Sequence, residues 1–437
     1  MKIQVPAAFD YPLMFSMISL IGVGTAFIYS SGTNEVAVNI LNEYVKHIMF
    51  AVLGFVLLSV TAAFDYRRAY CFTPYAYLGL LAALAYTAFF GHYVSGTRAW
   101  LGVGNFGIQP SEFGKIVFIL TLACYLERSA SYPPFQRFLS AFFLLLLPFA
   151  LILFQSDFGT AIVYIPIFLS MCFIAKADSR FIIVAVLIVT LSFVFAVLPI
   201  WESEILQKPL SAVRIFRRDN VRFSVAIAAS IVTLVSIIGW LAFKNKYYLL
   251  VAYFFGIVAA ALLLSSAVSQ MLKSYQIKRL VVFFDPTNDI QGAGWNIRQS
   301  KIAIRSGGLW GRGFLKGTQN QFLPKQSTDF IFSGLAEEWG FAGCIVICAL
   351  FFFILARTLL IVKNTADAFG RYIATGIFGL FFFHFAVNVG MVMGLIPVVG
   401  IPLPFLSYGG SFLWTTMMCV GLLMSINYRC FDVRRLW

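Results

Sequence analysis

The sequence predicts an all-α polytopic integral membrane protein with about 12 transmembrane helices and a large outer loop. Hydrophobic residues make up 60% of the 437 residues and charged residues only 11%. This composition leaves too little polar surface to cover a soluble protein of this size. The apolar runs are continuous and long enough to cross about 30 Å of hydrocarbon as helices, whereas the strands of a membrane barrel would alternate apolar and polar residues.

Twelve apolar segments account for the predicted spans. Nine are clear uncharged runs, a tenth carries charge only at its entrance, and two more share the stretch Tyr372–Tyr428, which Pro397–Pro404 divides. The first run is full length and lacks a small-residue cleavage site, so we expect a first span and not a signal peptide. The nine clear runs are 11–31, 48–64, 69–91, 138–156, 158–175, 181–201, 223–243, 247–272 and 339–356, and the tenth is 112–126.

Lysine and arginine residues predict the orientation of these spans. With a cytoplasmic N-terminus, every inner loop carries Lys or Arg, and the even number of spans places both termini in the cytoplasm. Two outer segments are also basic: residues 202–222 hold four arginines, and residues 273–329 hold nine Lys or Arg against three Asp. Long loops escape the positive-inside rule, so their basicity favours an anionic ligand. Simple contact with lipid headgroups is the alternative, chiefly for the first segment.

Charged residues are almost absent from the middle of the spans, where each would cost about 2.5–3.5 kcal/mol. Glu112, Lys115, Asp157 and Asp329 fall at predicted outer ends of helices, which favours chemistry at the membrane surface over an ion relay. A spacing of three places Glu112 and Lys115 on one helix face, as a structural or a functional pair. The seven Cys and three His show no metal-ligand or redox spacing, so we predict structural roles for them.

Seven polar motifs stand in order along the chain. They are 96–102 (GTRAWLG), 109–115 (QPSEFGK), 155–160 (QSDFGT), 292–301 (GAGWNIRQSK), 306–313 (SGGLWGRG), 322–330 (FLPKQSTDF) and 400–411 (GIPLPFLSYGGS). Taken together and in this order, they closely resemble the SEDS family of peptidoglycan glycosyltransferases, the RodA/FtsW/SpoVE group, over nearly the whole chain. The turn Pro397–Gly400 looks more like RodA than FtsW. The chain departs from the family's usual residues at Lys325, Ser327, Arg305 and Phe412.

This resemblance implies an inverting glycosyltransferase with a fold like the GT-C class. Such an enzyme polymerises lipid II, an undecaprenyl-pyrophosphate-linked precursor, at the outer face of the bacterial cytoplasmic membrane during cell elongation and cell-shape maintenance. It also implies a class B penicillin-binding protein transpeptidase and other elongation-complex proteins as partners, and no nucleic acid. No cofactor is certain, although Mg²⁺ or Mn²⁺ is compatible with the chemistry. Three alternatives are a lipid II flippase or transporter, an FtsW-like septal polymerase and a non-catalytic scaffold.

The resemblance also implies the site residues, of which Asp329 matches the family's essential aspartate and is the predicted catalytic base. By residue type alone, Asp329 would more readily be a helix cap before residues 330–335. Trp100 resembles a family position needed for activity, and the alternative is a tryptophan of the interfacial belt. Asp157 either supports the central cavity that the resemblance implies beside Asp329 or caps the sixth span. Lys115, Arg98, Arg298 and Lys301 are the candidates to hold the pyrophosphate. The full predicted substrate-binding set is Arg98, Trp100, Gln109, Glu112, Lys115, Asp157, Arg298, Gln299, Ser300, Lys301 and Ser407.

The predicted organisation follows from these assignments. Residues of about 202–270 have no counterpart in most family members, so two helices are inserted there, and the large loop keeps its outward side because two is even. We expect N-terminal transmembrane helices 1–7 in 1–201, the inserted segment in 202–272, the large extracytoplasmic loop with the catalytic site in 273–338, and the C-terminal helices in 339–437.

Overall fold

The computed structural model describes residues 10–32, 42–94, 96–103, 106–203, 219–271, 274–284, 293–318 and 326–429. The chain divides into two compact units. Unit 1 comprises residues up to Ala177 together with those from Asn296 onward, and unit 2 comprises Asp178–Trp295. The described residues do not include three arginines of the first basic outer segment, Arg214, Arg217 and Arg218. They also do not include Lys325.

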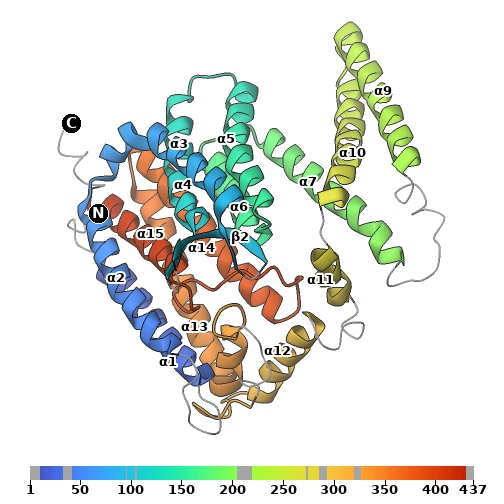
Figure 1. The fold of residues 1–437 in the computed structure, drawn as a ribbon. Coiled ribbons are helices and arrows are strands. Elements are labelled where there is room, and N and C mark those ends of the chain that lie inside the picture. The colour runs from blue at the N-terminus through green and yellow to red at the C-terminus, as the bar shows by residue number, and fades with distance from the viewer. Residues whose placement is uncertain are drawn as a thin grey trace. The chain divides into compact units, whose positions relative to one another are not determined.

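Each of the twelve predicted apolar segments coincides with a helix (Figure 1). Ten of the described helices are long and apolar enough to cross a membrane. The apolar helix α6 is shorter, and α4 carries charged residues. The helices are α1 (Tyr11–Gly32), α2 (Glu43–Ala63), α3 (Tyr66–Phe90), α4 (Pro110–Arg128), α5 (Pro134–Phe154), α6 (Phe158–Ile174), α7 (Ser179–Trp201), α9 (Asp219–Phe243), α10 (Lys246–Met271), α11 (Ser274–Phe284), α12 (Ala293–Gly307), α13 (Ile331–Asn364), α14 (Ala368–Val392) and α15 (Gly410–Arg429).

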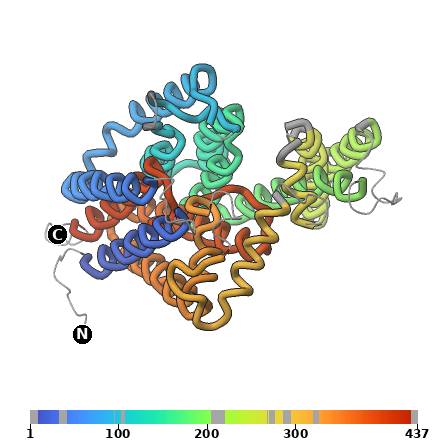
Figure 2. Tube along the Cα trace, turned by 60° about the horizontal axis from the view of Figure 1, so that its bottom comes forward, coloured from blue at the N-terminus to red at the C-terminus, as the bar shows by residue number. Residues whose placement is uncertain are grey.

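Helices α14 and α15 form the core of unit 1. Helix α14 packs against α6, α13 and α4, while α15 packs along α2, which lies beside α1 (Figure 2). Glycines permit these close contacts, as is common between membrane helices. A side chain at Gly379 would meet the Pro166 carbonyl oxygen of α6 at 3.0 Å, and one at Gly421 would collide with Thr61 of α2. Of the ten described helices that are long and apolar enough to cross a membrane, α14 and α15 have the largest buried share.

The segment 92–108, which the sequence predicts as a loop, forms a small antiparallel sheet. Its strands β1 (His92–Val94), β2 (Thr97–Val103) and β3 (Phe106–Ile108) are ordered β1-β2-β3, with His92 opposite Trp100. Gly96 has φ +91° in the turn between β1 and β2, a conformation that glycine adopts without strain. The sheet lies between the end of α3 and the start of α4, so it fixes where α4 begins.

Helix α13 is interrupted at Gly340, which has φ +65°. A side chain there would collide with the backbone of Gly311, so the loop before α13 lies directly against the kink. The interruption separates a short buried segment, Ile331–Trp339, from the long apolar part that follows. Because the short segment begins at Ile331, two residues after Asp329, the helix starts inside the region predicted as loop.

Unit 2 contains α7, α9, α10 and α11. Helix α10 packs against both α9 and α7. In the α9–α10 pair, a side chain at Gly239 would lie 2.8 Å from the ring of Tyr248, so glycine permits this contact. The pair lies within the segment 202–272, where the sequence predicts two helices. Helix α11 is amphipathic, with Leu280 and Val282 buried and Lys278 exposed.

Candidate active site

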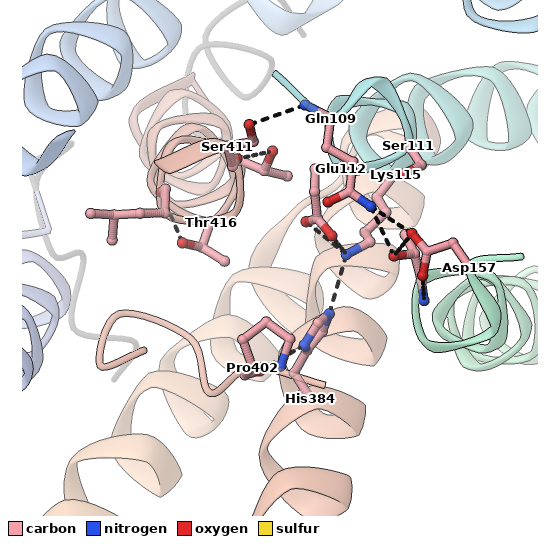
Figure 3. Close-up of polar contacts among 12 residues, drawn as sticks. Gln109, Ser111, Glu112, Lys115, Asp157, His384, Pro402, Ser411 and Thr416 are labelled. Atoms are coloured by element: carbon pink, nitrogen blue, oxygen red, sulfur yellow. Dashed lines mark hydrogen bonds and ion pairs between the residues drawn. The ribbon is translucent and has the colours of Figure 1, made fainter. Parts of the chain in front are cut away.

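Glu112 and Lys115 form an ion pair in the interior of unit 1. Helix α4 begins with Pro110, whose fixed φ suits a first helical position, and the next turn carries both residues on one face, as their spacing predicts. The ammonium nitrogen Nζ of Lys115 lies 2.9 and 2.8 Å from the two carboxylate oxygens of Glu112 (Figure 3). Their side chains point toward one another, and Lys115 is only 1% exposed. Two charges are thus neutralised by each other away from bulk water.

His384 supplies a third contact to this pair from α14. Its Nε2 lies 3.4 Å from Nζ of Lys115, and its Nδ1 lies 3.0 Å from the carbonyl oxygen of Pro402 (Figure 3). A carbonyl oxygen only accepts, so Nδ1 carries the proton and the lone pair of Nε2 faces the ammonium. The ring of Phe412 lies 4.9 Å from the His384 ring and 5.5 Å from Nζ of Lys115.

Gln109 and Asp157 meet beside the ion pair. Asp157 is the N-cap residue of α6, where its carboxylate accepts hydrogen bonds from the backbone N–H and the hydroxyl of Thr160 at 3.1 and 2.7 Å. The Gln109 amide also donates to this carboxylate, at 2.5 Å. The backbone N–H of Gln109 donates to the Ser411 hydroxyl at 3.2 Å, which joins the start of α4 to the start of α15. Asp157 therefore has the capping role that the sequence offered, and it also orients Gln109.

The turn that carries Asp329 is held through three successive carbonyl groups. The carbonyl of Ser327 accepts from the backbone N–H of Tyr408 at 2.9 Å, and that of Thr328 accepts from the Ser407 hydroxyl at 2.5 Å. The carbonyl of Asp329 accepts from the Asn388 side-chain amide at 3.0 Å. Asp329 itself is half-buried. Because α13 begins at Ile331 with Phe330 as its N-cap residue, the capping alternative for Asp329 does not match the observed helix start.

The partners of this turn belong to the segment between α14 and α15, residues 393–409. This segment is the non-helical break that the prolines of Pro397–Pro404 predict. Its backbone has positive φ at Gly394, Gly400 and Phe405. The Ser407 hydroxyl accepts from the backbone N–H of Leu403 at 2.8 Å, which closes the segment on itself. Such irregular backbone at the end of a membrane bundle is tolerated where protein satisfies its polar groups.

Tyr408 follows Ser407 in this segment. Burial, with a smaller contribution from the Glu43 carboxylate, raises the pKa of its hydroxyl, so that the group is neutral at physiological pH. Its ring lies 6.4 Å from the ring of His47, which is fully buried. The segment therefore contacts α2 on one side while its backbone holds the Asp329 turn on the other.

Arg98 and Trp100 lie on β2. The backbone N–H of Arg98 donates to the carbonyl of Gln155 at 3.0 Å, whereas its side chain is exposed. The Trp100 ring lies over Gly107 of β3, where a side chain would approach the ring to 2.8 Å. The sheet thus fixes Trp100, which is half-buried, and leaves the cation of Arg98 at the surface.

The predicted residues of α12 divide by exposure. Arg298 is exposed, while Gln299 and Ser300 are buried. The Ser300 hydroxyl donates to the carbonyl of Val392 at 2.8 Å, so it joins α12 to the end of α14. The side chain of Lys301 lies over Gly394, directly after α14.

Glu337 and Glu338 are fully buried, and both bind groups of the loop that precedes α13. Glu337 accepts from the backbone N–H and the hydroxyl of Thr318 at 2.9 and 2.8 Å, and Arg312 lies 3.8 Å away. Glu338 accepts from the backbone N–H of Leu315 at 3.0 Å. The sequence analysis assigned His384 a structural role and did not single out Asn388. The available signal was two polar residues four positions apart in an otherwise apolar span, where polar side chains are costly.

Together, the fold and the site define a multi-pass membrane protein with a polar centre enclosed at one end of its helices. The family model for the FtsW, RodA and SpoVE cell cycle proteins matches residues 11–216 and 226–430. The chain belongs to this family, which confirms the resemblance seen in the motifs.

Two individual relatives agree with the assignment to this family. The chain is 47% identical to peptidoglycan glycosyltransferase RodA of Treponema pallidum strain Nichols, over 98% of this chain and 100% of that protein. It is 33% identical to peptidoglycan glycosyltransferase MrdB of Escherichia coli strain K12, over 86% of this chain and 83% of that protein.

Two solved structures share the fold. A chain from a peptidoglycan synthase complex that coordinates polymerization and crosslinking aligns with a TM-score of 0.69 and 23% identity, over 97% of this chain and 99% of that chain. The rod shape determining protein RodA of Thermus thermophilus aligns with a TM-score of 0.59 and 21% identity, over 97% of this chain and 98% of that chain. The predicted all-helical membrane fold is confirmed.

Proposed function

We propose that this chain is a peptidoglycan glycosyltransferase of the RodA type. It polymerises lipid II into glycan strands at the outer face of the cytoplasmic membrane during cell elongation. The names of the two relatives at 47% and 33% identity support the activity, and a probable FtsW of Trichlorobacter lovleyi is less similar, at 30%. The observation that carries the proposal is the clamped turn of Asp329 at the same end of the bundle as the buried cation Lys115.

The chemistry requires little beyond these two groups. Pyrophosphate is already a good leaving group, so the protein must mainly supply a base for the attacking hydroxyl and cations for the departing charge. Asp329 takes the proton from the 4-hydroxyl of the acceptor sugar, whose oxygen then attacks the anomeric carbon of the donor. The bond from that carbon to the pyrophosphate oxygen breaks, the configuration inverts, and undecaprenyl pyrophosphate leaves. Lys115, Arg98, Arg298 and Lys301 remain the proposed cations.

Clamping of the backbone serves this chemistry because a base must be held at a fixed distance and angle from the proton it removes. Three successive carbonyls of the Asp329 turn are bonded to groups outside that turn, so the Cα atom of Asp329 has little freedom. The side chain can then select the acceptor hydroxyl without first ordering a loop.

A divalent cation is compatible with this site. Mg²⁺ is commonly held by one or two carboxylates together with substrate phosphates. Within the residues that the structure describes, no group of three His, Cys, Asp or Glu side chains could hold a metal by itself. Asp329 and the pyrophosphate of the substrate would therefore be the ligands, and the ion would offset charge on the leaving group.

The orientation and the partner belong to the same proposal. At the end of the helices opposite the site lie Arg67, Arg137 and Arg429, and Arg357 of α13 binds Asp10, which precedes α1. These cations support a cytoplasmic position for that end and for both termini. A class B penicillin-binding protein is the proposed partner. The fold shared with a chain of a synthase complex that couples polymerization and crosslinking supports this choice.

The decisive experiment reconstitutes the purified protein in liposomes with fluorescent lipid II, with and without the transpeptidase partner. We expect glycan ladders on a gel that lengthen with time. A parallel sample tests whether labelled precursor crosses the bilayer, measured by accessibility to a membrane-impermeant quencher. If the protein transports the precursor but forms no polymer, the proposal is wrong and the protein is a flippase. If it shows neither activity in the presence of the partner, the protein is a non-catalytic scaffold.

A further inference from the structure

One set of hydrogen bonds connects the buried cation with the turn of the proposed base. The first part of it runs from Lys115 through His384 to Pro402. Nζ of Lys115 lies 3.4 Å from Nε2 of His384, and Nδ1 on the other side of the ring lies 3.0 Å from the Pro402 carbonyl (Figure 3). The imidazole therefore bridges helix α4 and the segment between α14 and α15.

The second part begins at the two neighbours of Pro402. The carbonyl of Ile401 accepts from the Asn388 amide at 2.7 Å, and the same amide nitrogen donates to the carbonyl of Asp329. The backbone N–H of Leu403 donates to the Ser407 hydroxyl, which in turn donates to the carbonyl of Thr328. Three consecutive residues, 401–403, thus connect the cation to the turn of the base by two routes.

The spacing on α14 explains why both anchors meet this segment. His384 and Asn388 are four residues apart, so they lie one above the other on a single helix face. Both are buried, at 1% and 0% exposure. One binds Pro402 and the other binds Ile401. The rigid helix therefore fixes the distance between the contact to Lys115 and the contact to Asp329.

We infer that His384 is a positioning residue for the transfer reaction, which holds the ammonium of Lys115 at a set distance from Asp329. Lys115 has three N–H donors, and its contacts comprise the two oxygens of Glu112 and Nε2 of His384. Glu112 fixes the ammonium within α4, whereas His384 fixes it relative to the Asp329 turn. This inference rests on the proposed glycosyltransferase activity.

Phe412 completes the arrangement from α15. Its ring contacts the imidazole on one side and lies near the Lys115 ammonium. It fills the space around the His384–Lys115 contact with an apolar surface, which strengthens a hydrogen bond to a charged group. The family resemblance places a usual serine at this position, so the ring is a feature of this chain.

The test compares three replacements of His384 in the reconstituted polymerisation assay, with kcat, KM for lipid II and the melting temperature measured for each. His384→Gln keeps an amide long enough to face both Lys115 and Pro402. His384→Asn keeps an amide that is too short to reach Lys115. His384→Leu keeps only the volume of the side chain and removes both polar contacts. We expect Leu and Asn to lower kcat about tenfold to a hundredfold with little change in KM, and Gln to recover to within about threefold of the wild-type rate.

Rates that follow the melting temperatures, or a Gln variant as slow as Leu, would show that His384 only fills space and would overturn the inference. Wild-type kcat in the Leu variant would do the same. The Asn and Gln comparison decides the matter even if the Leu variant does not fold. A wild-type protein that lengthens no glycan would overturn the proposed function and this inference together, and that outcome is seen without any variant.

Discussion

The two ends of unit 1 use charged residues in opposite ways. At the end away from the site, Arg137 donates to the carbonyls of Leu126 and Ala175 at 2.7 and 3.0 Å, where α4 and α6 end. At the site end, where the same two helices begin, Lys115 bonds Glu112 inside the bundle. The C-terminal ends of helices carry unpaired carbonyls and partial negative charge, so a cation there is stabilising. A buried ion pair is different, because desolvation offsets most of its attraction.

This difference separates structural charge from functional charge. The far end would lose stability without its arginines, since buried carbonyls would lack partners. The pair at the site end contributes little net stability, and an apolar pair of the same shape would serve the fold as well. Its presence in a membrane bundle is therefore better explained by chemistry than by folding.

Replacing the proposed base should produce the largest effect on activity. Asp329→Asn keeps the size of the side chain and removes its ability to take a proton, so the polymerisation rate should fall about 10²–10⁴-fold at an unchanged melting temperature. The matched control is Asp10→Asn at the far end, where Asp10 pairs with Arg357 at 2.7 Å. That variant should lose stability and keep its rate per folded molecule. Full activity of Asp329→Asn would reject the assignment.

Lys115→Met should damage both folding and activity, because it leaves the Glu112 carboxylate buried without its partner. We expect a loss of about 3–5 kcal/mol in the free energy of unfolding. The double variant Glu112→Gln with Lys115→Met removes both charges and should recover most of that stability, measured as resistance to denaturant, while polymerisation remains low. Recovery of activity along with stability would mean that the pair is structural, like the charges of the far end.

Residue spacing and hydropathy predict helices and contacts between residues that are close in sequence. The apolar runs predict the twelve apolar helices, and the interval of three predicts the Glu112–Lys115 pair, because these features depend on neighbours in sequence. Helices α11 and α12 lie in the segment 273–338, which was predicted as a loop. The role of Asp329 came only from the family resemblance, since residue type alone favoured a helix cap. In the structure Phe330, and not Asp329, precedes the first residue of α13.

Contacts between distant segments could not be predicted in this way. His384 and Lys115 are 269 positions apart, and nothing in either segment specifies the other. The sheet at 92–108 was missed because two of its three strands have only three residues, and because Gly102 and Gly107 stand within strands, where glycine is disfavoured. The kink at Gly340 was missed because a single glycine in an apolar run is ordinary. What requires glycine at this position is the close approach of the loop 307–318, which is a contact between distant segments.

At the far end, Arg137→Met should lower the free energy of unfolding by about 1–3 kcal/mol, since the carbonyls of Leu126 and Ala175 lose a charged donor. The rate per folded molecule should stay at the wild-type value because no group at the site end changes. Thermal unfolding and the polymerisation assay, run on the same preparation, check both parts. A loss of rate without a loss of stability would contradict the division between the two ends.

The smallest expected effect concerns the clamp itself. Ser407→Ala removes the hydroxyl that bonds both Thr328 and Leu403, so the Asp329 turn keeps two of its three anchored carbonyls. We expect about a fivefold lower kcat, which corresponds to about 1 kcal/mol in the barrier. Thr358→Val is the control, because its buried hydroxyl donates to the Ile354 carbonyl of its own helix, far along α13, and among the described residues it has no bond to the Asp329 turn. If both variants lower kcat equally, the loss reflects a missing buried hydroxyl in general. If only Ser407→Ala does so, the position of the Asp329 backbone limits the rate, and the site end differs from the far end in geometry as well as in charge.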